Sequence, residues 1–144
     1  MSMAEPYYDN GVVQLFQGDC RQLLAGMVSE SVHCVVTSPP YWGLRDYGLP
    51  PSVWGDKGCQ HTWGEDVVVR REHHNKEGTS TLRGSTLAQV SAGTFEVRSH
   101  FCRQCGAWSG TLGLEPTPES YVCHIVEVFR EVWRVLRRDG TCWL

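Results

Sequence analysis

The tetrapeptide Ser38-Pro39-Pro40-Tyr41 contains the residue types that most directly suggest chemistry. Consecutive prolines fix the backbone with outward-facing carbonyl groups, while a hydroxyl precedes them and an aromatic ring follows. Such a turn can bind a flat amino-bearing ring, because its acceptors take the NH₂ hydrogens and the aromatic side chain stacks on the ring face. The alternative is a rigid turn that only ends a strand, which is the commoner meaning of a bare Pro-Pro pair.

Two short clusters of cysteine and histidine predict a structural metal site. Cys102 and Cys105 are separated by two residues and followed by Gly106, as in a knuckle where two thiolates hold one ion and glycine allows the tight turn. Cys59 and His61 provide a second pair. Together the two pairs supply a Cys₃His set, which suits tetrahedral zinc without an open coordination position.

Alternatives to this zinc site stay open at the level of sequence. His100 could replace His61, and the thiols could be idle or form a redox pair, although no thioredoxin-like βαβ pattern surrounds them. We interpret His73 and His74 as solvated loop residues. The remaining cysteines fall in predicted helix or sheet and are expected to fill the core: Cys20, Cys34, Cys123 and Cys142.

The elements before the tetrapeptide follow an α/β pattern. Residues 12–16 form a short β-rich run, and Asp19 can then cap a helix whose apolar residues fall at helical spacing before Ser29. Residues 32–37 are almost continuously apolar, which is typical of a strand buried on both faces of a parallel sheet. The tetrapeptide ends this strand, and the carboxyl ends of strands are where open α/β sheets bind ligands.

The last part of the chain predicts a long helix and one more strand. Thr117 and Pro118 form a helix start, with proline at the first helical position. The apolar stripe of this helix spans about five turns: Val122, Ile125, Phe129, Val132 and Leu136. Cations expected in its last turn favour the helix dipole: Arg134, Arg137 and Arg138. Gly140 is expected to end the helix, and residues 141–144 to begin a strand.

Residues 43–113 are expected to form an insert between these elements. Both Cys/His pairs lie in it, and residues 73–93 have few apolar anchors, which predicts a mobile loop. The order strand, helix, strand, insert, helix, strand implies an α/β fold with a parallel sheet and helices on its faces. Three strands are few for such a fold, so we expect residues 1–144 to be one part of a larger domain.

The amino-acid composition limits the classes of protein to which this chain can belong. The chain has 144 residues, of which 41% are hydrophobic and 20% charged, so it can form a core. Its net charge of −3 means that a nucleic-acid partner must be argued from a local site. No apolar run approaches the roughly 20 residues of a membrane helix, and residues 1–10 do not read as a signal peptide. Seven cysteines without such a signal indicate thiols or metal ligands in the cytoplasm.

The motifs taken together resemble the amino-group DNA methyltransferases, which methylate cytosine N4 or adenine N6 with S-adenosylmethionine. The resemblance rests on Gly18-Asp19-Cys20, residues 37–42 and residues 121–144, in that order. It is similar to the β-type permutation of the family, in which the catalytic half comes first. It implies a Rossmann-like methyltransferase fold, here partial and carrying a zinc-ribbon-like insert, with DNA as partner and no membrane association.

The resemblance also implies roles for the tetrapeptide. Ser38 and the carbonyl group of Pro39 would accept hydrogen bonds from the target amine, which positions it and frees its lone pair. Pro40 completes the catalytic motif, and Tyr41 would stack on a base flipped from the duplex. Serine in the first position leans toward cytosine, but adenine stays open as the target.

The resemblance places Asp19 and Cys20 in the cofactor site, where Asp19 would bind the adenine amine of S-adenosylmethionine. The alternative for Asp19 is a helix N-cap. The chain lacks the Phe-x-Gly-x-Gly loop that the family uses for the methionine end of the cofactor. We therefore expect this chain alone to be incomplete and inactive, with a missing C-terminal half or a second copy completing the site. The second interpretation is a non-catalytic zinc-ribbon module, on a degenerate α/β scaffold, that binds nucleic acid or protein.

Overall fold

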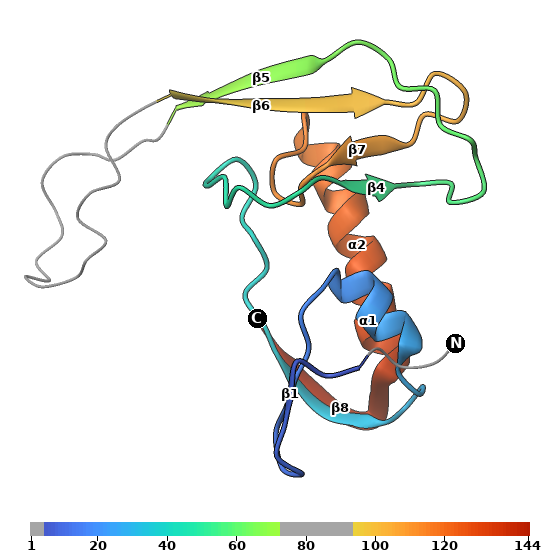
Figure 1. Ribbon diagram of the computed structural model, residues 1–144. Helices are drawn as coiled ribbons and strands as arrows, with labels where there is room; N and C mark the ends of the chain where they lie inside the picture. Colours follow the sequence, from blue (N-terminus) through green and yellow to red (C-terminus); the bar gives the residue numbers. More distant parts are fainter. Residues whose placement is uncertain (1–4, 73–93) are drawn as a thin grey trace, which may run out of the picture. The chain divides into compact units, whose positions relative to one another are not determined.

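The computed structural model describes residues 5–72 and 94–144, which fall into two compact units (Figure 1). Unit 1 consists of Met1–Pro39 and Glu119–Leu144, and unit 2 consists of Pro40–Pro118. The boundary between the units therefore falls inside the tetrapeptide. The segment 73–93, which we predicted to be a mobile loop, lies outside the described residues.

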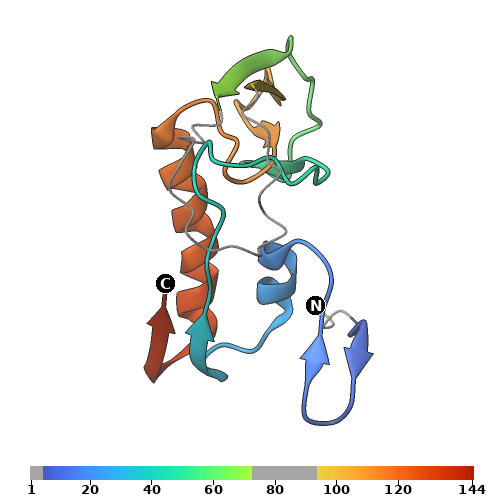
Figure 2. The same ribbon diagram turned by 90° about the vertical axis from the view of Figure 1, so that its left-hand side faces the viewer.

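Unit 1 contains the predicted parallel pairing. Strand β3 (Val32–Val36) pairs in parallel with β8 (Leu136–Trp143), and in Figure 2 the two arrows run side by side in the same direction. The register shifts early in the pair, so that β8 bulges before regular pairing resumes. Gly140 lies in this bulge, where an added Cβ would come within 2.8 Å of the Leu136 side chain. The bulge therefore depends on a residue without a side chain.

The predicted strand at residues 12–16 pairs differently from our expectation. Its ordered part, β2 (Gln14–Leu15), forms an antiparallel hairpin with β1 (Tyr8–Asp9) instead of a third parallel strand. The Asn10 side-chain oxygen accepts hydrogen bonds from two backbone N–H groups of the turn, at 3.0 and 2.7 Å. Gly11 supplies the φ of +79° that the turn requires. These local bonds close the hairpin with the preceding residues.

Helix α2 (Pro118–Val135) begins where the sequence predicted and ends earlier. Its last two carbonyl groups accept hydrogen bonds from the backbone N–H groups of Glu30 (3.0 Å) and Ser31 (2.9 Å). These bonds join the helix end to the segment that enters β3, so sheet pairing starts at the next residue. The residues expected to close the helix therefore lie in β8: Arg137, Arg138 and Gly140.

The buried face of α2 overlaps only partly with the predicted stripe. Its buried side chains are Val128, Val132 and Val135. Val122, which we placed in the stripe, is 56% exposed. Burial lies in the second half of the helix, where the Arg134 guanidinium donates to the carbonyl of Leu24 in α1 (Cys20–Gly26) at 2.7 Å. Within residues 5–72 and 94–144, no helix is both long and apolar enough to cross a bilayer.

Unit 2 is built on an antiparallel sheet. Its strands are β4 (Ser52–Trp54), β5 (Val67–Glu72), β6 (Thr94–Phe101) and β7 (Trp108–Gly110), in the spatial order β4-β7-β6-β5. Trp54 and Trp108 are paired in the register of β4 and β7, and both are buried. The tryptophans of this segment therefore supply much of its core, because each buries a large apolar surface.

Candidate functional site

The four predicted metal ligands lie together in unit 2. The ligand atoms of Cys59, His61, Cys102 and Cys105 all lie within 4.8 Å of one another. The Cys59 Sγ atom is 3.9 Å from the Cys102 Sγ atom, and the Cys105 Sγ atom is 3.5 Å from His61 Nδ1. A tetrahedral zinc ion with Zn–S bonds of about 2.3 Å and Zn–N bonds of about 2.05 Å requires an S···S separation of about 3.8 Å and an S···N separation of about 3.6 Å. The donor types and their spacing therefore fit zinc.

Backbone hydrogen bonds explain why the second half of the cluster has this shape. The Cys102 N–H donates to the carbonyl of Ala107 (2.7 Å), and the Gly106 N–H donates back to the carbonyl of Cys102 (2.9 Å). Gly106 adopts a φ of +73°, a conformation that favours glycine. The Gln104 N–H points at the Cys102 sulfur, 3.4 Å away. This is the tight turn that the Cys-x-x-Cys-Gly pattern predicted.

The first half of the cluster is held against this turn by two contacts. The Arg103 N–H donates to the carbonyl of Thr62 (2.9 Å), and Trp63 forms a β-bridge with Cys102. The ring of Trp63 also stacks on His61, with ring centroids 4.8 Å apart. The hydrogen bond and the β-bridge hold the segment that carries Cys59 and His61 beside the Cys-x-x-Cys turn.

The structure shows which of the two candidate histidines lies with the three cysteines. His61 lies in the cluster, whereas His100 Nδ1 lies 3.5 Å from the Asp66 carboxylate. His73 and His74 lie outside the described residues. The expectation for the remaining cysteines is wrong, because these four are exposed in the described part of the chain: Cys20, Cys34, Cys123 and Cys142. They lie on α1, α2 and a two-stranded sheet that leaves side chains on its faces uncovered.

The thiols of the cluster differ in acidity. Burial opposes ionisation of Cys102, but hydrogen bonds from the backbone of Cys105 and Gln104 and from His61 lower its pKa to about 6. Burial and the neighbouring thiols of Cys105 and Cys102 raise the pKa of Cys59 to about 12. Once one thiolate has formed, a second negative charge beside it is unfavourable unless a cation is bound.

The tetrapeptide is exposed where chemistry would require it. Ser38 and Pro39 follow β3 in unit 1, directly after Thr37, whose N–H extends the ladder to the carbonyl of Trp143 (3.1 Å). They thus stand at the carboxyl end of a parallel strand. Ser38 is exposed, and in unit 2 Tyr41 is 64% exposed. A hydroxyl acceptor and an aromatic face are therefore both accessible to a ligand.

Asp19 has the role that we gave as its alternative. It caps α1, accepting a hydrogen bond from the Arg21 N–H at 2.9 Å, and its carboxylate pairs with the Arg21 guanidinium at 2.7 Å. Arg21 is buried and also lies 3.6 Å from Glu127. Cys20 is the exposed first residue of the helix. The cofactor roles of Asp19 and Cys20 stay predictions.

Sequence reasoning missed a buried carboxylate in unit 2. Glu115 is fully buried, and its Oε2 atom accepts a hydrogen bond from the Gly113 N–H at 2.8 Å. Its backbone carbonyl accepts a hydrogen bond from Trp42 Nε1 at 2.9 Å. Trp42 follows the tetrapeptide directly, but no local pattern links it to a glutamate so much later in the chain. Only the folded structure reveals the contact.

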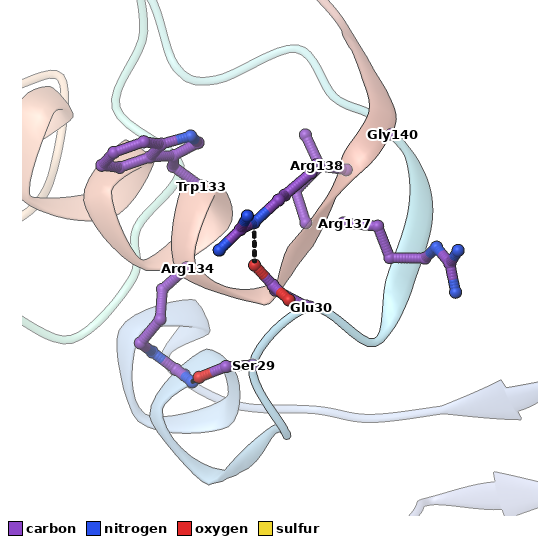
Figure 3. Close-up of a pocket in the computed structure, with 8 residues that line it drawn as sticks. Ser29, Glu30, Trp133, Arg134, Arg137, Arg138 and Gly140 are labelled. Atoms are coloured by element: carbon purple, nitrogen blue, oxygen red, sulfur yellow. Dashed lines mark hydrogen bonds and ion pairs between the residues drawn. The ribbon is translucent and has the colours of Figure 1, made fainter.

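A further hollow lies in unit 1, at the end of α2 (Figure 3). It has a volume of about 560 Å³, and the side chain of Trp133 beside it is exposed. Each arginine that borders the hollow is paired with an acidic side chain: Arg134 with Glu131, Arg137 with Asp139, and Arg138 with Glu30. Charge in this hollow is therefore balanced, and we assign it no ligand.

Comparison with known proteins finds similarity to Type II methyltransferases. The chain is 30% identical over 130 residues to the Type II methyltransferase M.XycI of Xanthomonas campestris pv. cyanopsidis, which is 90% of this chain and 24% of that protein. It is 28% identical over 131 residues to M.SmaI of Serratia marcescens, covering 91% of this chain and 25% of the relative. Over 50 residues it is 52% identical to M.Cfr9I of Citrobacter freundii, covering 35% and 16% of the two chains.

No family model and no solved structure matches the chain. The chain spans about a quarter of the length of M.XycI and of M.SmaI. All three relatives are Type II methyltransferases, which is the kind of protein that the tetrapeptide and its neighbouring motifs resemble. These similarities to Type II methyltransferases over nearly the whole chain support its resemblance to the amino-group DNA methyltransferase family.

Proposed function

We propose that this chain is the catalytic part of a site-specific DNA methyltransferase. Its reaction would transfer a methyl group from S-adenosylmethionine to the exocyclic amine of cytosine or adenine in DNA. The observation that carries the proposal is the Ser-Pro-Pro-Tyr sequence after parallel strand β3, with Ser38 and Tyr41 exposed, in a chain similar to Type II methyltransferases.

The tetrapeptide could overcome the main chemical obstacle of the reaction, which is the low nucleophilicity of the target amine. An exocyclic amine is a poor nucleophile because its lone pair is delocalised into the base. Two acceptors, the Ser38 hydroxyl and the Pro39 carbonyl, would bind its two N–H groups and draw the nitrogen toward tetrahedral geometry. The freed lone pair would then attack the electrophilic methyl group that S-adenosylmethionine supplies when bound. The methyl–sulfur bond would break, S-adenosylhomocysteine would leave, and the methylated amine would lose one proton to solvent.

The exposed ring of Tyr41 would hold the base while the amine reacts. A base inside a duplex cannot reach such a turn, so the target must be flipped out and stacked on a new aromatic surface. Tyr41 presents that surface, with 64% of the residue accessible. Stacking needs the aromatic ring of Tyr41 but not its hydroxyl group, so the hydroxyl group has no chemical role in the proposed reaction.

The cofactor site is proposed to need residues beyond those of this chain. Asp19 would accept the adenine amine, and a carboxylate has enough lone pairs to do so while it pairs with Arg21. A glycine loop for the methionine end would come from a missing C-terminal half or from a second copy. Val36 and Trp143, at the ends of β3 and β8, are 79% and 63% exposed, as expected of strands that further structure covers.

We also propose that the Cys₃His cluster of residues 59–105 binds one structural zinc ion and staples the insert at residues 43–113. The separations of the donor atoms fit tetrahedral zinc, and four protein ligands leave no open position for a reacting water. The same cluster supports the second candidate function, a zinc-ribbon module that binds nucleic acid or protein without catalysis. Methyl transfer distinguishes the two candidates.

The proposal is tested by incubating the protein, as its gene encodes it, with duplex DNA and isotopically labelled S-adenosylmethionine. Digestion to nucleosides and mass spectrometry should find the label in N4-methylcytosine or in N6-methyladenine, which also identifies the target base. Label found in neither nucleoside, with intact zinc and folded protein, contradicts the proposal and favours the binding module.

A further inference from the structure

Glu115 is the most deeply buried acidic side chain in the described residues, and the proposed chemistry does not use it. It is 0% exposed and lies in the loop between β7 and α2. A buried carboxylate is costly unless it is hydrogen-bonded, so a side chain of this kind needs a structural or functional reason. Its Oε2 atom accepts the hydrogen bond from the Gly113 N–H at 2.8 Å.

The segment from Gly113 to Glu115 contacts the residues at the end of the tetrapeptide and just after it. The Glu115 carbonyl accepts from Trp42 Nε1 at 2.9 Å, and the Gly113 carbonyl accepts from the Gly43 N–H at 2.7 Å. An added Cβ on Gly113 would lie 3.0 Å from the Pro40 Cβ and 3.4 Å from the Tyr41 carbonyl oxygen. The segment is therefore hydrogen-bonded to Trp42 and Gly43 and lies close to Pro40 and Tyr41, and all of these residues belong to unit 2.

We propose that Gly113–Glu115 form a cradle for the substrate turn and that Glu115 is its positioning residue. The inference rests on the proposed function, since it assigns the cradle to the turn that would bind the base. The Glu115 carboxylate fixes the Gly113 N–H, and Gly113 holds a φ of +91° that favours glycine. The carbonyl of the same residue accepts the hydrogen bond from the Gly43 N–H. By holding the backbone next to Tyr41, the cradle would fix the direction in which the exposed Tyr41 ring points.

The cradle is continuous in sequence with the Cys₃His cluster. Ala107, which accepts the hydrogen bond from the Cys102 N–H, directly precedes β7 (Trp108–Gly110), and the cradle follows that strand. β7 is also paired on both sides, with β4 and with β6. A paired strand thus connects the proposed zinc site to the cradle. The metal would then contribute to catalysis by fixing the strand from which the cradle extends, without contacting substrate.

The first test replaces Glu115 by alanine and by glutamine in the protein as its gene encodes it. Glu115→Ala is expected to lower kcat about 10- to 100-fold, because small displacements of a substrate-holding group cost rate steeply. KM for S-adenosylmethionine should change by less than about twofold, since the cradle does not touch the cofactor side. Glu115→Gln keeps an oxygen acceptor for the Gly113 N–H and should recover part of the rate. Ser99→Ala, which alters another buried polar residue of unit 2, should have no such effect.

A second variant keeps the test decisive if Glu115→Ala fails to fold. Gly113→Ala would push against Pro40, whereas Gly48→Ala meets nothing within 4 Å although Gly48 also has a positive φ of +64°. Both variants place a side chain at a positive φ, but only Gly113→Ala also meets a neighbouring residue, and only it is expected to reduce methyl transfer. It should also shift the indole N–H resonance of Trp42 in a ¹H–¹⁵N spectrum, because the hydrogen bond to Glu115 is disturbed.

The outcomes separate this inference from the proposed function. If the wild-type protein methylates DNA but Glu115→Ala and Gly113→Ala keep full kcat, the cradle is overturned while the proposed function stands. If the wild-type protein transfers no methyl group, the proposed function fails, and the Trp42 resonance then decides whether the cradle exists. An unchanged Trp42 resonance in both variants overturns the cradle in either case.

Discussion

Replacing Cys102 and Cys105 together by serine should abolish zinc binding. Wild-type protein is expected to carry about one zinc ion per chain, because four ligands of suitable softness are already assembled. The S···S separation of 3.9 Å between Cys59 and Cys102 places the centre of a regular tetrahedron about 2.4 Å from each sulfur, close to the usual Zn–S bond. The double variant removes two of the four ligands, so its zinc content should fall close to zero.

The stability of unit 2 should fall with the metal. Free zinc at about 1,000 times its dissociation constant stabilises a folded state by about 4.1 kcal/mol. A domain of the size of Pro40–Pro118 shifts in Tm by about 4–8 °C for each kcal/mol, so loss of zinc should lower the Tm of unit 2 on the order of 20 °C. The β3–β8 pairing and the buried face of α2 do not involve the cluster. Unit 1 should therefore keep its structure longer than unit 2.

Metal analysis of purified protein and hydrogen exchange of peptides from each unit measure both effects. The matched control is the double variant Cys123→Ser, Cys142→Ser, which changes two exposed cysteines of unit 1 and should keep zinc. Chelation should accelerate exchange in unit 2 before unit 1. Full zinc occupancy in the Cys102→Ser, Cys105→Ser variant would refute the assignment of these cysteines as zinc ligands. Simultaneous unfolding of both units on chelation would refute the independence of unit 1 from the metal.

Three further predictions concern the turn, the cofactor and pH. Tyr41→Ala should weaken capture of a flipped base by about 1–3 kcal/mol and Tyr41→Phe much less, as measured by binding to DNA with a mismatched target; equal losses would contradict stacking. The 144-residue chain alone should bind S-adenosylmethionine weakly or not at all in a calorimetric titration, and micromolar affinity would show that the site is already complete. Because the pKa of Cys59 is raised to about 12, its thiol must lose a proton when zinc binds. Zinc affinity measured by chelator competition should therefore fall at least about tenfold from pH 7.5 to 6.5, and an affinity independent of pH would contradict this.

Short motifs with fixed chemistry were predictable from sequence. The Cys-x-x-Cys-Gly pattern dictates a tight turn, and the structure brings its two cysteines to Cys59 and His61. The apolar run before the tetrapeptide predicted a parallel strand buried on both faces. Its pairing with β8 confirms the parallel strand, but the burial was wrong, because none of the side chains of β3 is buried in the described part of the chain. Both features follow from neighbouring residues, where spacing and residue type carry most of the information.

Features that depend on competition between partners were not predictable in this way. Asn10 and Gly11 close a local hairpin, so β2 pairs with β1 and not with the parallel sheet. The end of α2 is set by hydrogen bonds to Glu30 and Ser31 from far earlier in the chain. Glu115 meets Trp42 only because the antiparallel sheet brings the two segments together. The conformational preferences of neighbouring residues do not predict any of these contacts.

The most direct test of the central claim is the rate of methyl transfer to duplex DNA by Ser38→Ala in the protein as its gene encodes it. Removing one of two acceptors that hold the amine in the transition state should cost roughly 2.7–4 kcal/mol, which is about 10²- to 10³-fold in kcat. Ser99→Ala, at a buried serine away from the turn, should retain its rate, and zinc content should be unchanged in both. Near-full activity of Ser38→Ala would contradict the account and leave the two prolines as a strand terminator.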